Sequence, residues 1–154
     1  MRWAQGRATV EQLLAVKDLQ LVPPSRDHAD RLLTQAAHHL DTARAAASSD
    51  PEGAYGVLYD AARKALTAIL ANQGLRPTSR GGHIAVFQSV RAQLDPPMGR
   101  TVQPFDRIRR RRKDAEYPDS DVPELTAEDV AEDLPKVEAI VAMARQALDS
   151  RSPF

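Results

Sequence analysis

Six basic side chains stand within eight residues in the second half of the chain. Residues 106–113 read Asp-Arg-Ile-Arg-Arg-Arg-Arg-Lys. A guanidinium group can bind two phosphate oxygens at once, so this run predicts a contact with phosphate or nucleic acid. Successive helical residues differ by about 100°, so the arginines cannot all share one face. At least one is expected to turn towards the protein interior or a subunit partner. The alternative interpretation is a solvated basic helix end, neutralised by its acidic neighbour.

That acidic neighbour follows directly. Between residues 114 and 135 there are nine acidic residues and no basic one. Glu128, Asp129, Glu132 and Asp133 could be read as a metal cluster. The spacing favours instead a solvated first turn of a helix, stabilised by the helix dipole.

A second candidate for anion binding is the glycine-rich segment before residue 83. Arg76, Arg80, Gly81 and Gly82 precede a predicted helix N-terminus, which could receive a phosphate. The segment matches neither a P-loop nor a dinucleotide fingerprint, so an ordinary flexible loop is favoured. His83 is expected to cap or orient this loop. No two histidines have the four-residue spacing that brings two imidazoles to one metal, so no metal site or cofactor is predicted.

Composition excludes several classes of protein. There are 21 basic and 21 acidic residues, so neither a uniformly basic nucleic-acid binder nor a polyacidic tail protein fits. The absence of cysteine excludes disulfides, thiolate catalysis and cysteine-ligated zinc. The longest apolar run, residues 139–144, is too short to cross a bilayer, and residues 1–7 carry no apolar signal-peptide core. A cytoplasmic protein without membrane contact is expected.

Helices must position these side chains. Apolar periodicity and capping residues predict helices over about 10–18, 26–47, 51–72, 83–93 and 102–116, and a last one after Thr126 that Pro135 kinks or splits. Residues 74–82 are expected to form a loop, and Pro118 and Pro123 lie in an exposed connection. No segment predicts a strand. The expected fold is all-α, an antiparallel bundle of about five to six helices. It divides into an N-terminal helix and linker (1–25), the bundle (26–149) and a tail (150–154).

Three stretches, residues 54–66, 74–83 and 105–118, together resemble the HEPN domain, in particular an actinobacterial-type subgroup. HEPN domains are all-helical modules of prokaryotic toxin–antitoxin and nucleotidyltransferase-partner systems. The resemblance covers about residues 26–149 and implies a HEPN-like helical bundle.

The resemblance also implies where a site would lie. In active HEPN ribonucleases an arginine is followed four to six residues later by a histidine, often with a tyrosine two residues beyond, and two chains bring both motifs to one cleft. Placing Tyr117 on that tyrosine puts Arg110 on the arginine and Ala115 on the histidine. A second alignment puts Arg112 on the arginine and Glu116 near the histidine. In both alignments the motif histidine is missing.

The missing histidine changes the expected chemistry. Metal-independent RNA cleavage needs proton transfers near neutral pH, which histidine performs and arginine does not. The resemblance therefore implies a non-catalytic module that dimerises and engages RNA, a nucleotide or a nucleotidyltransferase partner. The residues expected to do so are Arg109, Arg110, Arg112 and Tyr117. Support from Tyr59, Asp60 and Arg63 is expected at the same cleft, although simple pairing within their helix is the alternative.

Two other functions stay open. One is a metal-independent endoribonuclease toxin of a toxin–antitoxin system, with Arg110 as clamp and Glu116 or Tyr117 moving the protons. The other is a purely structural homodimer in which the basic and acidic segments pair across subunits.

Overall fold

The computed structural model describes residues 4–117 and 121–150. Most of these residues are helical, as the sequence predicts. Pro118 and the C-terminal tail beyond Ser150 lie outside the described residues. In chain order the elements are α1 (Arg7–Ala15), β1 (Leu19–Leu21), α2 (Arg26–Ala46), α3 (Pro51–Gln73), β2 (Leu75–Pro77), α4 (Gly82–Leu94), α5 (Gly99–Val102), α6 (Pro104–Glu116) and α7 (Ala127–Ser150).

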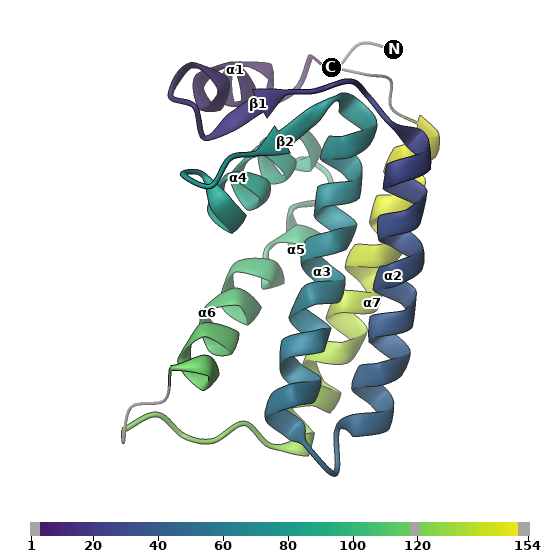
Figure 1. Cartoon of the computed structure of the whole chain (residues 1–154), viewed down its shortest axis with the longest axis vertical. Coiled ribbons are helices and arrows are strands. Elements are labelled where there is room, and N and C mark those ends of the chain that lie inside the picture. The colour runs from purple at the N-terminus through teal and green to yellow at the C-terminus, as the bar shows by residue number, and fades with distance from the viewer. Residues whose placement is uncertain (1–3, 118–120, 151–154) are drawn as a thin grey trace.

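The three long helices α2, α3 and α7 run side by side and form the body of the molecule (Figure 1). Their ends are where the sequence places them. Ser25 caps α2 by accepting a hydrogen bond from the His28 N–H, and Asp50 caps α3 in the same way from Gly53. Gly74 ends α3 with φ 83°, a left-handed conformation that suits glycine. Small buried alanines line the faces of α2 and α3 that meet, which lets the two helix axes approach closely.

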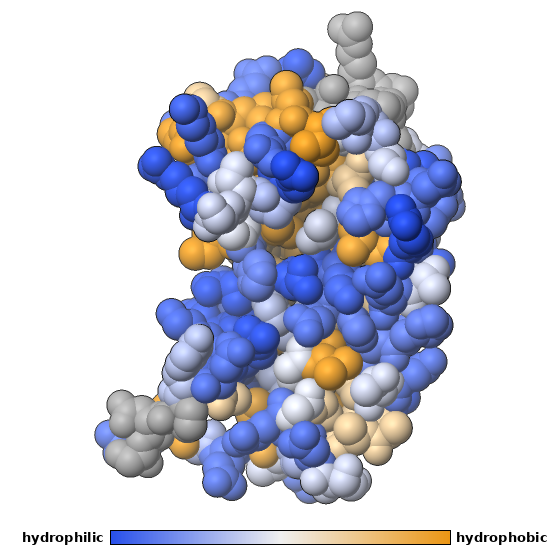
Figure 2. Space-filling view, viewed as in Figure 1, coloured by the Kyte–Doolittle hydropathy of each residue, from blue (hydrophilic) through white to orange (hydrophobic). Residues whose placement is uncertain are grey.

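Helix α6 stands to one side of this body and packs mainly on α3 (Figure 1). Two apolar side chains, Phe105 and Ile108, anchor it and are fully buried. Apart from Pro104 and Ala115, the rest of α6 is charged, and Figure 2 shows hydrophilic residues gathered over this part of the surface. The helix therefore presents its arginines on two flanks and along its outer edge.

Three expectations about elements are wrong. Residues 19–21 and 75–77 form a short antiparallel pair of strands, with Gln20 opposite Arg76, where no strand was predicted. Three residues are too few to show a period in the sequence. The first helix begins at Arg7, not near residue 10, and follows Gly6 in a left-handed conformation. The predicted helix over 102–116 is two helices, because α5 ends at Val102 and Pro104 begins α6. Of the two alternatives expected for Pro135, a kink or a split, the split does not occur, because α7 continues from Ala127 to Ser150.

The N-terminal segment shares the core of the bundle. Helix α1 packs against α4, and Val10, Leu13 and Leu19 are buried in the same apolar cluster as the long helices. Together α1, the strand pair and α4 cover one end of the body, above α6 in Figure 1. None of the helices among the described residues is long and apolar enough to cross a membrane.

Candidate phosphate-binding site

Two tyrosines of α3 organise the contact with α6. Tyr55 and Tyr59 are four residues apart, so they share a helix face, and both are buried. Arg111 and Arg112 are consecutive on α6 and divide between them. The Arg111 guanidinium lies 5.4 Å from the centre of the Tyr55 ring, and that of Arg112 lies 5.5 Å from the centre of the Tyr59 ring. Such cation–π contacts hold α6 in register on α3.

The Tyr55 side is closed by a buried carboxylate. Asp133 of α7 has no exposed surface and accepts a hydrogen bond from the Tyr55 hydroxyl at 2.7 Å. Arg107 donates to one of its oxygens, and Arg111 donates to the other at 3.0 Å. Lys136 donates to it as well, at 3.1 Å. We call Asp133 and these four donors the Asp133 cluster.

The donors of the Asp133 cluster stabilise the ionised form of the buried carboxyl group. Burial alone would raise the pKa of the Asp133 carboxyl, but hydrogen bonds from Tyr55, Lys136 and Arg107 outweigh burial and hold the pKa below its ordinary value. The Tyr55 pKa is raised, by burial and by the neighbouring carboxylate. The cluster therefore has an ionised acid and a protonated phenol at neutral pH, and it joins α3, α6 and α7.

The Tyr59 side ends on a histidine instead. The Tyr59 hydroxyl lies 2.6 Å from Nδ1 of His83, in the first turn of α4. Burial raises the pKa of Tyr59 to about 12, so its hydroxyl keeps its proton and needs an acceptor. With that hydroxyl donating to Nδ1, the ring proton of neutral His83 is on Nε2. Partial burial, with the charges of Arg63 and Arg112, lowers the pKa of His83 below its ordinary value. His83 then offers an N–H donor on its free nitrogen.

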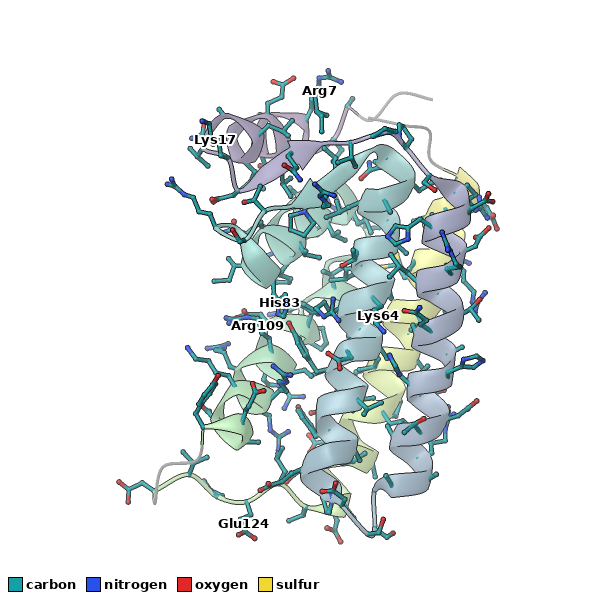
Figure 3. All side chains as sticks on the ribbon, in the orientation of Figure 1. Arg7, Lys17, Lys64, His83, Arg109 and Glu124 are labelled. Atoms are coloured by element: carbon teal, nitrogen blue, oxygen red, sulfur yellow. The ribbon has the colours of Figure 1, made fainter. Side chains whose placement is uncertain are left out.

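A cavity of about 390 Å³ opens beside this histidine, between the start of α4 and the outer turns of α6. Figure 2 shows the surface indented there, and Figure 3 shows His83 and Arg109 facing the same space. Its walls bring glycines, aromatic rings and cations together. The lining residues are Tyr59, Gly81, Gly82, His83, Ile84, Arg109, Arg112, Lys113, Glu116 and Tyr117. We call this the His83 cavity.

Comparison with known proteins now places the chain. A sequence model of the HEPN domain matches residues 29–147, which is most of the chain. The chain belongs to the HEPN domain family. Searches of curated proteins and of solved structures gave no significant match.

The His83 cavity contains three of the four residues that the sequence predicts for ligand binding in this HEPN domain. Arg109, Arg112 and Tyr117 all line it. Arg109 is tied to Asp106 at 2.9 Å and Arg112 to Glu116 at 2.9 Å, both within α6. Tyr117 is 73% exposed at the rim. Arg110 lies elsewhere, on the other flank of α6, where it contacts Asp106 at 3.3 Å and lines a separate cavity.

Tyr59, Asp60 and Arg63 are expected either to support the cleft or to pair within their helix, and the structure shows both arrangements. Tyr59 reaches the His83 cavity. Asp60 and Arg63 pair with each other along α3 at 3.7 Å, which is the simpler alternative. Arg63 still acts on the site through its charge, because it is one of the groups that lower the pKa of His83.

Two residues have contacts that the sequence does not predict. The expectation of a solvated acidic turn is wrong for Asp133, which is fully buried, because Arg107 and Arg111 turn inward to meet it. His83 lies beside the two glycines, as the sequence predicts. It also contacts Tyr59, which is 24 residues away in the sequence. Within the described residues, no group of three or more acidic, histidine or cysteine side chains is placed to hold a metal ion.

Proposed function

We propose that this HEPN domain is a non-catalytic module that holds phosphate groups of RNA or of a nucleotide in the His83 cavity. The observation that carries the proposal is that Arg109, Arg112 and His83 line one cavity, while Nδ1 of His83 is engaged by the Tyr59 hydroxyl. All three are donors to an anion when His83 is neutral with its proton on Nε2. The exposed ring of Tyr117 adds a surface on which a base can stack.

The geometry supports holding over cutting. A general base must have a free lone pair facing the proton that it removes. In the arrangement described, the Nδ1 lone pair of His83 accepts from Tyr59, and Nε2 carries the proton. Glu116 is engaged by Arg112, so the acid that could replace the missing motif histidine is itself paired.

The proposal includes assembly as a homodimer, as the family resemblance implies. Ile84 is 50% exposed and Tyr117 is 73% exposed, and both lie on the rim of the His83 cavity. Apolar side chains at that rim suit a second copy, or a nucleotidyltransferase partner, that covers the cavity and its bound phosphate. Pairing of basic and acidic segments across subunits is not needed for charge balance, because Arg111 already pairs with Asp129 at 2.7 Å within the chain.

Binding of a labelled single-stranded RNA tests the proposal. The double variant Arg109→Ala/Arg112→Ala is expected to weaken binding at least about tenfold at low salt, because two phosphate contacts are lost. Arg31→Ala serves as the control, since Arg31 is exposed on α2. Equal affinity of the double variant and the unchanged protein would overturn the proposal.

The presence of His83 in the cavity also favours the second candidate, a metal-independent endoribonuclease. Here His83 donates its Nε2 proton to the leaving oxygen, so it supplies the general acid that the arginine-rich helix lacks. RNA incubated with the protein in EDTA should then be cleaved, and His83→Gln should stop the cleavage. Intact RNA at high protein concentration is the result expected for the non-catalytic module.

A further inference from the structure

A second cationic cavity lies on the opposite flank of α6. It measures about 500 Å³ and is formed where α4, α5, α6 and α7 meet. Its lining holds five basic side chains and one acidic one. The lining residues are Phe87, Arg91, Arg100, Gln103, Pro104, Asp106, Arg107, Arg110 and Lys136. We call this the Arg100 cavity.

The charges of the Arg100 cavity are not balanced by its neighbours. Arg107 and Lys136 share the buried Asp133 carboxylate, Lys136 also pairs with Glu132 at 3.7 Å, and Arg110 shares Asp106 with Arg109. Among the described residues, Arg91 and Arg100 have no acidic side chain within ion-pair distance, and both are exposed. A protein with zero net charge thus concentrates a local positive potential here, which attracts polyanions.

Both flanks of α6 combine cations with an aromatic ring. In the Arg100 cavity, the Arg91 guanidinium lies 5.9 Å from the centre of the Phe87 ring. In the His83 cavity, Arg109 and Arg112 line the same space as the exposed Tyr117. Arginines that follow the backbone, with aromatic side chains for the bases, are the means by which proteins hold single-stranded nucleic acid.

We infer that the Arg100 cavity is a second phosphate site, and that one single-stranded polynucleotide crosses α6 and occupies both cavities. This inference rests on the proposed function, and it selects a polynucleotide over a free nucleotide. A helix with its side chains is about 10–12 Å wide, so a single phosphate cannot occupy both flanks. Arg110, which is 66% exposed and lines the Arg100 cavity, contacts the strand there.

Binding of short and long ligands to two matched double variants tests the inference. Arg91→Ala/Arg100→Ala removes two cations from the Arg100 cavity, and Arg31→Ala/Arg145→Ala removes two exposed cations from α2 and α7. The probes are adenosine monophosphate and a single-stranded RNA decanucleotide. The first variant is expected to weaken decanucleotide binding at least about tenfold and to leave the monophosphate unaffected. Its slope of log affinity against log salt should fall by about 1.4, two contacts at about 0.7 each. The control pair should change neither.

The outcomes separate the inference from the proposed function. If Arg91→Ala/Arg100→Ala leaves decanucleotide binding unchanged while Arg109→Ala/Arg112→Ala weakens it, the second site is wrong and the first stands. If neither pair changes binding, the proposed function itself fails. Equal loss for monophosphate and decanucleotide would mean one nucleotide site and overturn the two-site path. Arg100→Glu alone serves as a second variant should the double variant unfold, because no ion pair of Arg100 is lost.

Discussion

Two tyrosines one helical turn apart on α3 each contact an arginine of α6. The two tyrosine–arginine pairs differ in the third side chain that they contact. Tyr55 and Arg111 meet the carboxylate of Asp133, which has no exposed surface. Tyr59 and Arg112 meet His83 at the edge of an open cavity. The two pairs share their residue types, their spacing and their cation–π geometry. The third partner alone distinguishes a structural contact from a candidate binding site.

The difference lies in where the positive charge is neutralised. In the Asp133 cluster a fully buried carboxylate from α7 accepts hydrogen bonds from Arg107 and Arg111, and removing these partners would leave that charge buried without compensation. At the His83 cavity the α7 carboxylate is absent from the lining, and the acids present, such as Glu116, are on the same helix as the arginines. Partly exposed pairs within one helix are weak, so an incoming phosphate can compete for the guanidinium group.

The largest expected effect comes from removing the arginines of the Asp133 cluster. Arg107→Ala/Arg111→Ala leaves the fully buried Asp133 with Tyr55 and Lys136 alone. We expect a loss of about 3 kcal/mol in the free energy of unfolding, measured by urea denaturation. Arg109→Ala/Arg112→Ala removes the same charge from the same helix and should cost no more than about 1 kcal/mol. Equal losses would show that the arginines of the Asp133 cluster and those of the His83 cavity contribute equally to stability.

A smaller effect separates the two tyrosines. Tyr55→Phe removes a hydrogen bond to a buried carboxylate and should lower the free energy of unfolding by about 1.5–3 kcal/mol. Tyr59→Phe removes a hydrogen bond between neutral groups and should cost about 0.5–1.5 kcal/mol. Both variants keep the ring and its contact with arginine. Thermal denaturation of the pair checks the order, and a greater loss for Tyr59→Phe would contradict it.

Much of this arrangement could be predicted from the sequence, because it depends on local signals. Ser25, Asp50 and Gly74 mark helix ends through interactions within four residues. The arginine run shows as a dense charge on one helix, and its length alone requires inward-facing members. Arg109, Arg110, Arg112 and Tyr117 are predicted together, and all but Arg110 line one cavity.

The remainder depends on contacts between distant residues. Asp133 has the same sequence context as its exposed neighbours Glu128 and Glu132, and only packing of α7 on α3 and α6 buries it. His83 lies 29 residues before Arg112, on a different helix, so no spacing rule connects them. A motif search along α6 shows only that the motif histidine is missing. It cannot detect His83, which α4 brings to the same cavity.

The smallest expected effect is a pH dependence of ligand binding, which we expect at the His83 cavity and not at the Asp133 cluster. The pKa of His83 is lowered from its ordinary value by partial burial and by Arg63 and Arg112, so the ring is neutral at pH 7 and gains a proton only at a more acidic pH than a free histidine does. That proton adds a positive charge beside Arg109, and Asp60 is the neighbouring acid that opposes the lowering. Binding of a phosphate-containing ligand should therefore strengthen as the pH falls, by up to about tenfold for each unit by which the ligand raises the pKa of His83.

The measurement uses RNA without terminal phosphates, because phosphodiester groups keep their charge over this range while a terminal phosphate titrates near pH 6. His83→Gln keeps an N–H donor but cannot titrate, so its affinity should lose this rise. His39→Gln is the matched control, since the His39 pKa is also lowered but its ring contacts Lys64, outside the cavity. A rise that persists in His83→Gln would place the responsible proton elsewhere. The titration of His83 would then no longer distinguish the Tyr59–Arg112 pair from the Tyr55–Arg111 pair.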